Sequence, residues 1–154
     1  MPRNLSYWSA ATGTLKESPQ FEVQAVQGAE TLGELFHYAV VLQTPDSPDL
    51  TALVAANLPY KQMVGHEAGL VIEVDGGGSR QINGLVTSAR FLHAQDRRSL
   101  YEVTLEPWLV LATRSSDHRI FQHLNVVEIS QQLLADYPYL LELRVSQRYP
   151  ARDF

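Results

Sequence analysis

Apolar and polar residues alternate along several stretches of the chain, and a period of two residues predicts β-strands. The clearest case is 99–106, where Tyr101, Val103 and Leu105 fall on one face and polar residues separate them. Pro107 ends this strand, because proline cannot donate a hydrogen bond to a sheet. The same alternation predicts further strands over 21–26, 35–43, 69–74, 80–91 and 141–145.

Two of the early strands have informative faces. In the strand 21–26, the alternation places Phe21, Val23 and Ala25 on the same face. The strand 35–43 is apolar on both faces, which favours packing against a second layer or another subunit over exposure to water.

The connections between these strands indicate an antiparallel arrangement. Asp75 and Gly76 separate two strand patterns, and Asp-Gly is a strong hairpin signal. Residues 93–98 form a polar turn, and Gly84 within the strand 80–91 predicts a bulge or a sharp curve. No long helix separates the early strands, which disfavours a parallel sheet. The predicted fold class is mainly β (α+β), a small antiparallel curled sheet or β-barrel followed by a helix-strand unit.

Two helices are predicted. A short one covers 50–55, with Asp49 as its N-cap. A longer one covers 126–137, where Asn125 is the cap and Glu128 completes a capping box. Because only 141–145 follows to cover this helix, we expect it to depend on later sequence. Its apolar stripe consists of Val126, Ile129, Leu133, Leu134 and Tyr137.

The chain is expected to have three parts. Residues 1–20 are polar and interrupted by proline and glycine, so they are expected to form a loosely held N-terminal arm. Residues 21–110 are expected to form the antiparallel β-barrel domain, and 111–154 the start of a second, truncated domain. The last residues contain no closing element, so the chain is expected to be a fragment of a longer one.

The composition excludes several classes of protein. The 154 residues include no cysteine, which excludes disulfides, thiolate metal sites and thiol nucleophiles. No apolar run approaches the roughly 20 residues that span a bilayer. The first residues lack the apolar core of an export signal, so the predicted start is cytosolic. A net charge of -5 argues against a nucleic-acid-binding surface.

Candidate catalytic and metal-binding residues cluster after the central strand. Ser115, Ser116, Asp117 and His118 are the residue types of a hydrolase triad, but adjacent positions do not by themselves converge, and no Gly-x-Ser-x-Gly elbow is present. His118 and His123 lack the spacing of a helical metal motif and have no His-Glu-x-x-His sequence. We therefore expect no catalytic, cofactor-binding or metal-binding residues, and no cofactor.

Three other features have a structural and a functional interpretation. The glycine-rich run 75–79 lacks the Lys-Ser/Thr of a phosphate loop and precedes a strand, so a hairpin turn is favoured. Arg97 and Arg98, with Arg90 nearby, form either a basic patch or a solvated turn, and the turn is favoured. Trp108 is expected to be a core residue and not a ligand platform.

Several short motifs occur in a fixed order along the chain. They are Ile82-x-Gly84-x-Val86, Tyr101-x-Val103-x-Leu105-x-Pro107-Trp108-Leu109, Arg114, Asp117-x-Arg119-Ile120-Phe121-Gln122, Val127-Glu128-Ile129 and Tyr149-Pro150-x-Arg152. This order resembles the N-terminal part of VgrG, the spike protein of type VI secretion systems, which is similar to the hub of contractile phage tails. The resemblance covers roughly 21–154. Glu106 stands where that family often has arginine, and 1–20 has no counterpart.

The resemblance implies a structural role. It implies a non-enzymatic hub adaptor, a homotrimer in the full-length protein, which docks on the Hcp tube and contacts baseplate components, with the β-helical spike missing from this chain. It also implies no nucleic acid, no membrane insertion by this region, and cytoplasmic assembly followed by secretion or injection into a target cell. The alternatives are a phage tail hub and a small β-barrel domain that binds a ligand or a nucleic acid.

Overall fold

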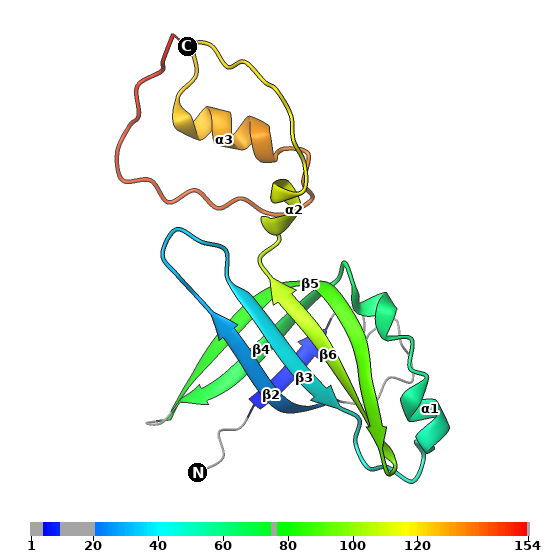
Figure 1. Ribbon diagram of the computed structural model, residues 1–154. Coiled ribbons are helices and arrows are strands. Elements are labelled where there is room, and N and C mark those ends of the chain that lie inside the picture. Colours follow the sequence, from blue (N-terminus) through cyan, green and yellow to red (C-terminus); the bar gives the residue numbers. More distant parts are fainter. Residues whose placement is uncertain (1–4, 10–20, 75–76, 154) are drawn as a thin grey trace. The chain divides into compact units, whose positions relative to one another are not determined.

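The computed structural model describes residues 5–9, 21–74 and 77–153 (Figure 1). Contacts divide the chain into an N-terminal unit, Met1–Trp108, and a C-terminal unit, Leu109–Phe154. The expected division into an arm, a barrel domain and a truncated second domain stays a prediction.

A six-stranded antiparallel sheet forms the N-terminal unit, with the strand order β1-β4-β5-β6-β3-β2. The sheet curls strongly (Figure 1), and its two edge strands, β1 and β2, contact each other. The predicted mainly β, antiparallel curled sheet is therefore confirmed. The strands are β1 Leu5–Ser9, β2 Glu22–Ala29, β3 His37–Gln43, β4 Glu67–Val74, β5 Gly78–Gln95 and β6 Arg98–Glu106.

The core lies inside the curl and consists of alternate residues of the strands together with Met63 of the segment before β4. Tyr101, Val103 and Leu105 of β6 are buried, as their alternation predicted. The Tyr101 ring contacts three other aromatic rings, and its hydroxyl donates a hydrogen bond to the carbonyl oxygen of Ala55 at 2.5 Å. The rest of the core cluster consists of Tyr38, Val40, Leu42, Met63, Ala68, Leu70, Ile82 and Val86.

The long strand β5 produces much of the curvature. Its first half pairs with β4 and its second half pairs with β6. Two register shifts leave Thr87 and Leu92 as extra residues opposite β6, and such bulges bend a strand. Gly84 allows the close approach of β6, because a Cβ at this position would lie 2.5 Å from the backbone oxygen of Glu106. The predicted curve is confirmed, but the extra residues are Thr87 and Leu92 and not Gly84.

Strand β1 was not predicted. Residues Leu5–Ser9 pair with β4, although 1–20 was expected to be a loosely held arm. Five residues are too few to give a clear alternating pattern, and the pairing depends on the exposed edge of a distant strand. Residues 10–20 lie outside the described part of the chain, as do Asp75 and Gly76 at the tip of the predicted β4–β5 hairpin. The pairing of Val74 with Gly78 nevertheless confirms that hairpin.

Two local predictions in the N-terminal unit were shifted. The short helix α1 covers Ala52–Ala56, and its N-cap is Thr51 in place of Asp49, since the Thr51 hydroxyl accepts a hydrogen bond from the Val54 N–H at 3.3 Å. A 3-10 helix, η2, follows at Tyr60–Met63. In β2, a register shift makes Gln24 an extra residue, so Val26 packs against the core and Ala25 is exposed.

The C-terminal unit contains the helices α2, Val110–Thr113, and α3, Val126–Leu134. The predicted capping box is confirmed: the Asn125 side chain accepts from the N–H groups of Val127 and Glu128, and the Glu128 carboxylate accepts from the Asn125 N–H. The helix ends three residues earlier than predicted. Of the residues described between 109 and 153, none is buried.

The predicted strand 141–145 is wrong. Alternation of apolar and polar residues stabilises a strand only where a neighbouring strand accepts its hydrogen bonds. The described part of the C-terminal unit contains no such neighbour, and its one bridge joins Leu124 to Arg152. Trp108, which was expected in the core, is only half-buried. No helix among the described residues is long and apolar enough to cross a membrane.

Candidate docking surfaces

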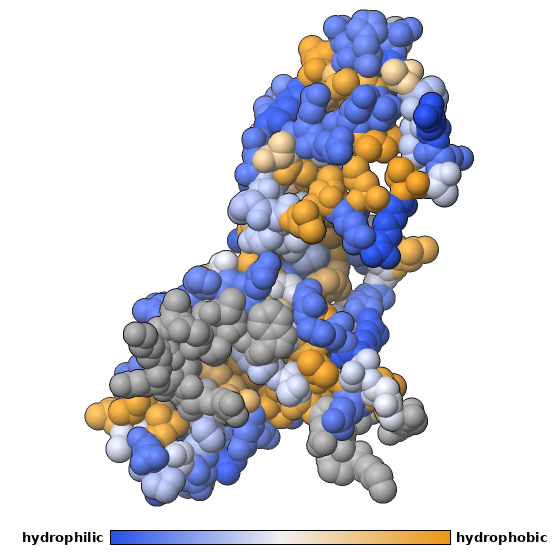
Figure 2. Space-filling view, turned by 180° about the vertical axis from the view of Figure 1, so that it is seen from behind, coloured by the Kyte–Doolittle hydropathy of each residue, from blue (hydrophilic) through white to orange (hydrophobic). Residues whose placement is uncertain are grey.

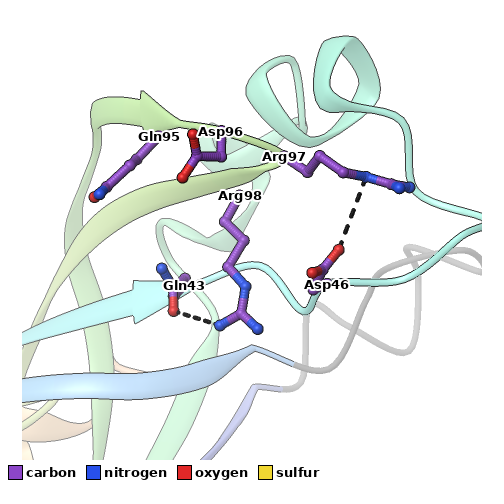
Figure 3. Close-up of a pocket in the computed structure, with 6 residues that line it drawn as sticks. All are labelled: Gln43, Asp46, Gln95, Asp96, Arg97 and Arg98. Atoms are coloured by element: carbon purple, nitrogen blue, oxygen red, sulfur yellow. Dashed lines mark hydrogen bonds and ion pairs between the residues drawn. The ribbon is translucent and has the colours of Figure 1, made fainter.

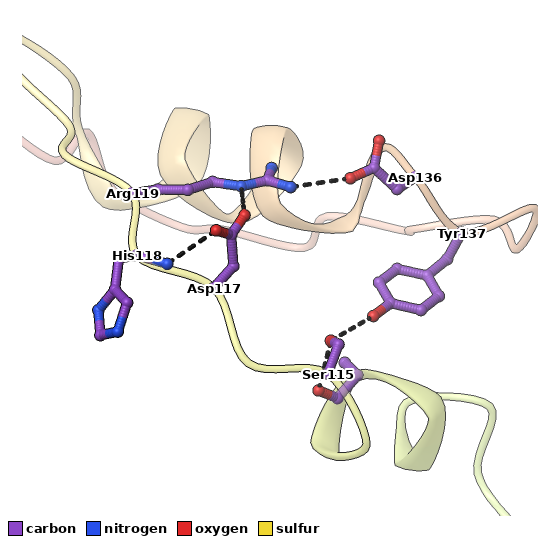
Figure 4. A network of polar contacts seen from close by, with 7 residues as sticks. Ser115, Asp117, His118, Arg119, Asp136 and Tyr137 are labelled. Carbon is purple, nitrogen blue, oxygen red and sulfur yellow. Dashed lines mark hydrogen bonds and ion pairs between the residues drawn. The ribbon is translucent and has the colours of Figure 1, made fainter.

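An arginine-centred network ties the start of the C-terminal unit to the end of α3 (Figure 4). The Arg119 guanidinium donates to the carboxylates of Asp117, at 2.5 Å, and Asp136, at 3.1 Å. The second oxygen of Asp117 accepts the backbone N–H of His118 at 2.8 Å. These bonds lower the pKa of the Asp117 carboxyl, the Arg119 hydrogen bond being the main cause. The network holds a loop in place, and its two carboxylates share a single guanidinium.

The residue types of a hydrolase triad do not assemble into one. The Ser115 hydroxyl lies 3.1 Å from the Tyr137 hydroxyl and donates to the Ala112 carbonyl. The His118 ring points away from both Ser115 and Asp117 (Figure 4), so no base is placed next to the serine. This geometry does not support nucleophilic catalysis by these residues.

His118 and His123 do not form a metal site in the described structure. The His123 ring lies 3.6 Å from the Asp153 carboxylate, and both side chains are largely exposed. Within residues 5–9, 21–74 and 77–153, no group of three or more histidine, aspartate or glutamate side chains could hold a metal ion.

The three arginines of the possible basic patch each pair with an acidic residue. Arg90 bonds to Glu102 across β5 and β6 at 2.7 Å. Arg98 contacts Glu22 and Gln43 at 3.2 and 3.0 Å, and Arg97 lies 3.8 Å from Asp46. Figure 3 shows Arg97 and Arg98 beside a shallow pocket at the β5–β6 turn. Because acidic and amide groups line the same pocket, the interpretation as a solvated turn fits better than a basic patch.

Neither unit contains an assembled catalytic or metal site among the described residues, but both have apolar residues on their surface (Figure 2). In the N-terminal unit, Leu32 in the β2–β3 loop is fully exposed. In the C-terminal unit, Val126 and Leu133 of the predicted apolar stripe are exposed, and Ile129 is half-buried. Exposed apolar residues that gather in one place mark interaction sites more often than single ones do.

The C-terminal unit also contains an apolar pocket at the start of α3. A backbone hydrogen bond from the Arg152 N–H to the Leu124 carbonyl oxygen, at 3.1 Å, brings its two sides together. The motifs that contribute to this pocket are visible in the sequence, but the sequence did not predict that they meet. The residues that line it are Leu124, Val126, Ile129, Tyr149, Pro150 and Arg152.

A family model described as the phage tail baseplate hub (GPD) matches residues 29–154, which include most of the curled sheet and the whole described C-terminal unit. The chain belongs to this family. Members of the phage tail baseplate hub family are structural proteins, and this membership supports the expectation that the chain is not an enzyme.

Several curated relatives are type VI secretion system spike proteins. VgrG1b of Pseudomonas aeruginosa is 35% identical over 115 residues, which cover 75% of this chain and 14% of that protein. VgrG5 of the same organism is 30% identical over 159 residues, covering 99% of this chain and 18% of that protein. The chain thus spans less than a fifth of the length of either relative. Because the VgrG5 match takes in almost the whole chain, the expectation that 1–20 has no counterpart is wrong.

A solved structure has the same fold. It is described as the E. coli c3393 protein, a component of the type VI secretion system with structural similarity to the T4 bacteriophage tail proteins gp27 and gp5. The TM-score is 0.68 with 21% sequence identity, and the match covers 96% of this chain and 37% of that one. At this identity the likeness supports the tail-hub fold and no finer role.

Proposed function

We propose that this chain is the hub part of a type VI secretion spike, a non-enzymatic module that trimerises and docks on the end of the Hcp tube. The observation that carries the proposal is the baseplate hub match over residues 29–154, together with the similarity to VgrG spike proteins. The exposed apolar residues of both units support a role in assembly, because an assembly protein needs contact surfaces.

The proposed trimer places limits on the interface. In a ring of three copies, each copy uses different surfaces on its two sides, a heterologous contact that closes after three rotations. Permanent interfaces of this kind bury on the order of 2,000 Å² or more. The proposed partners are two further copies of the chain, the Hcp tube and baseplate components. The proposed route is assembly in the cytoplasm, followed by secretion or injection into a target cell.

Sedimentation of the full-length protein with and without Hcp tubes tests this function. We expect the protein to sediment as a trimer and to be recovered with the tubes, while tubes alone and protein alone serve as the controls. A stable monomer without affinity for the tubes would overturn the proposal and favour the small binding barrel.

The family description also favours a second candidate, the hub of a contractile phage tail. The two roles predict different particles. Mass spectrometry of purified contractile structures from the source cells would find the chain together with Hcp in the first case. In the second case it would find the chain together with phage tail-tube and capsid proteins.

A further inference from the structure

The β2–β3 loop presents a leucine on a well-defined turn. The backbone N–H of Glu34 donates to the Thr31 carbonyl oxygen at 3.1 Å, and Gly33 has a positive φ of 86°, which glycine adopts without strain. An ion pair between Glu30 and Arg80 of β5 holds the base of the loop. Leu32 is 103% exposed at its tip. We call residues 30–34 the knob.

The knob carries one negative charge that is free to bind elsewhere. Arg80 neutralises Glu30, and the hydrogen bond from Arg80 lowers the pKa of that carboxyl. Glu34 is exposed and makes no ion pair or side-chain hydrogen bond with any residue that the structure describes. The knob therefore offers an apolar tip with a carboxylate two residues away.

The apolar pocket at the start of α3 is lined by a residue of the opposite charge. Its volume is about 280 Å³, which exceeds that of a leucine side chain, and its lining is mainly apolar. Arg152 lines the pocket and makes no ion pair within the described residues, and the adjacent Asp153 carboxylate lies 3.6 Å from the His123 ring. The pocket therefore combines an apolar interior with one free positive charge.

We propose that the knob of one copy binds in the pocket of a neighbouring copy, with Leu32 in the apolar interior and Glu34 facing Arg152. This inference rests on the proposed function, since it names the contact between copies that trimerisation requires. The knob and the pocket are different surfaces, so a contact made once between each pair of copies is heterologous and can close into a ring, whereas a two-fold dimer would make the same contact twice. Burial of the leucine supplies affinity, and the ion pair at the rim adds specificity and a dependence on salt.

These 154 residues contain no cysteine, so cysteines introduced into this part of the protein can serve as cross-linking probes. Leu32→Cys and Tyr149→Cys are introduced separately into full-length chains that carry different tags, and the two variants are co-expressed. In this mixture, a disulfide between positions 32 and 149 can form only between copies. We expect mild oxidation to give a mixed dimer on a non-reducing gel. The matched control pairs Tyr149→Cys with Leu140→Cys, a position that is 91% exposed, and should give little of that product.

The outcomes separate this inference from the proposed function. A trimer that shows no mixed link above the control overturns the knob contact and leaves the proposed function intact. A full-length monomer overturns both. If the Leu32→Cys/Tyr149→Cys double variant links only within single chains, the pocket is filled by its own copy, and the inference is again overturned.

A charge exchange gives an independent readout. Glu34→Arg or Arg152→Glu alone should weaken association of the copies severalfold, more at low salt than at high salt, and the double variant should recover most of the loss. Leu32→Ala should weaken association about tenfold or more, the effect of removing a central apolar contact. Leu140→Ala is the control. Equal effects of Leu32→Ala and Leu140→Ala would contradict the proposal.

Discussion

Gly84 is the residue that lets β6 run close to β5. An alanine Cβ there would lie 2.5 Å from the Glu106 oxygen and 3.1 Å from the Leu105 side chain, so the two strands would have to separate. We expect Gly84→Ala to lower the free energy of unfolding by about 1–3 kcal/mol, as overpacking does. Chemical denaturation followed by tryptophan fluorescence measures this change.

Gly78 is the matched control for that substitution. It lies on the same strand, and a Cβ at this position would meet no atom within 4 Å. Gly78→Ala should therefore change the stability by less than about 0.5 kcal/mol. Similar losses in the two variants would show that strand entropy, and not the approach of β6, explains the glycine at position 84.

Asp117 should titrate below the ordinary range of an aspartate. Arg119 and the His118 N–H stabilise its charged form and lower its pKa, so the stabilising contribution is present above the unfolded-state pKa and is lost as the pH falls through the folded-state pKa. Carbon-detected NMR of the side-chain carboxyl measures the midpoint. Arg119→Gln should raise it toward the usual value, whereas Arg144→Gln, which removes only the partner of Glu142, should not.

Which residues face the core could largely be predicted, because alternation alone determines the face in a regular strand. Tyr101, Val103 and Leu105 were found in this way. The exceptions are local. The extra residue Gln24 turns Ala25 outward, and the alternation of apolar and polar residues does not predict such a bulge. Trp108 was misjudged since it follows the end of β6, where alternation no longer gives information on burial.

Among the elements, α3 depends most clearly on its first turn. Asn125→Ala removes the acceptor for the N–H groups of Val127 and Glu128, and a lost N-cap costs about 1 kcal/mol. We expect faster amide exchange at Ile129, whose N–H bonds to the Asn125 carbonyl at 3.0 Å. Gln131→Ala, on the same helix and exposed, should leave that exchange unchanged or slower. Unchanged exchange at Ile129 in Asn125→Ala would show that tertiary contacts hold the helix.

Elements whose signals are local were predictable, and elements that need a distant partner were not. The capping box of α3 is determined by four consecutive residues, so it could be predicted from the sequence. The alternation over 141–145 is as regular as that of a real strand but finds no neighbour in the described structure. Strand β1 is the converse case, because its weak pattern is stabilised by pairing with β4, which lies about sixty residues away in the sequence.

For the whole molecule, the two units differ in how much they bury. The N-terminal unit has a continuous core, whereas the described C-terminal unit has no buried residue. In this chain alone, we expect the amides of α3 to exchange with lower protection than those of β6 around Val103. Hydrogen–deuterium exchange of both units in one sample compares them directly. Equal protection would contradict the view that the C-terminal unit depends on partners.

The sequence indicates the family of the chain, but it does not predict where the docking surfaces are. The order of short motifs was enough to indicate the hub family, and the family match confirms it. The knob and the pocket could not be predicted in the same way. The exposure of Leu32 depends on the geometry of a turn, and the pocket depends on a bridge between residues 124 and 152 that are far apart in sequence.

The extra residue Thr87 in β5 has a consequence for insertions and deletions. Val86 before it and Ala89 after it both pack against the core, so the inward-facing positions change from even to odd numbers at Thr87. A homologue that lacks this residue would keep every side chain on its present face, and would lose only the bend and the Thr87–Glu106 hydrogen bond. A deletion at Ile82 would instead move the side chains of the preceding part of β5 to the opposite face of the sheet. Length variation among relatives should therefore be tolerated at the bulge and excluded from the regular part of the strand.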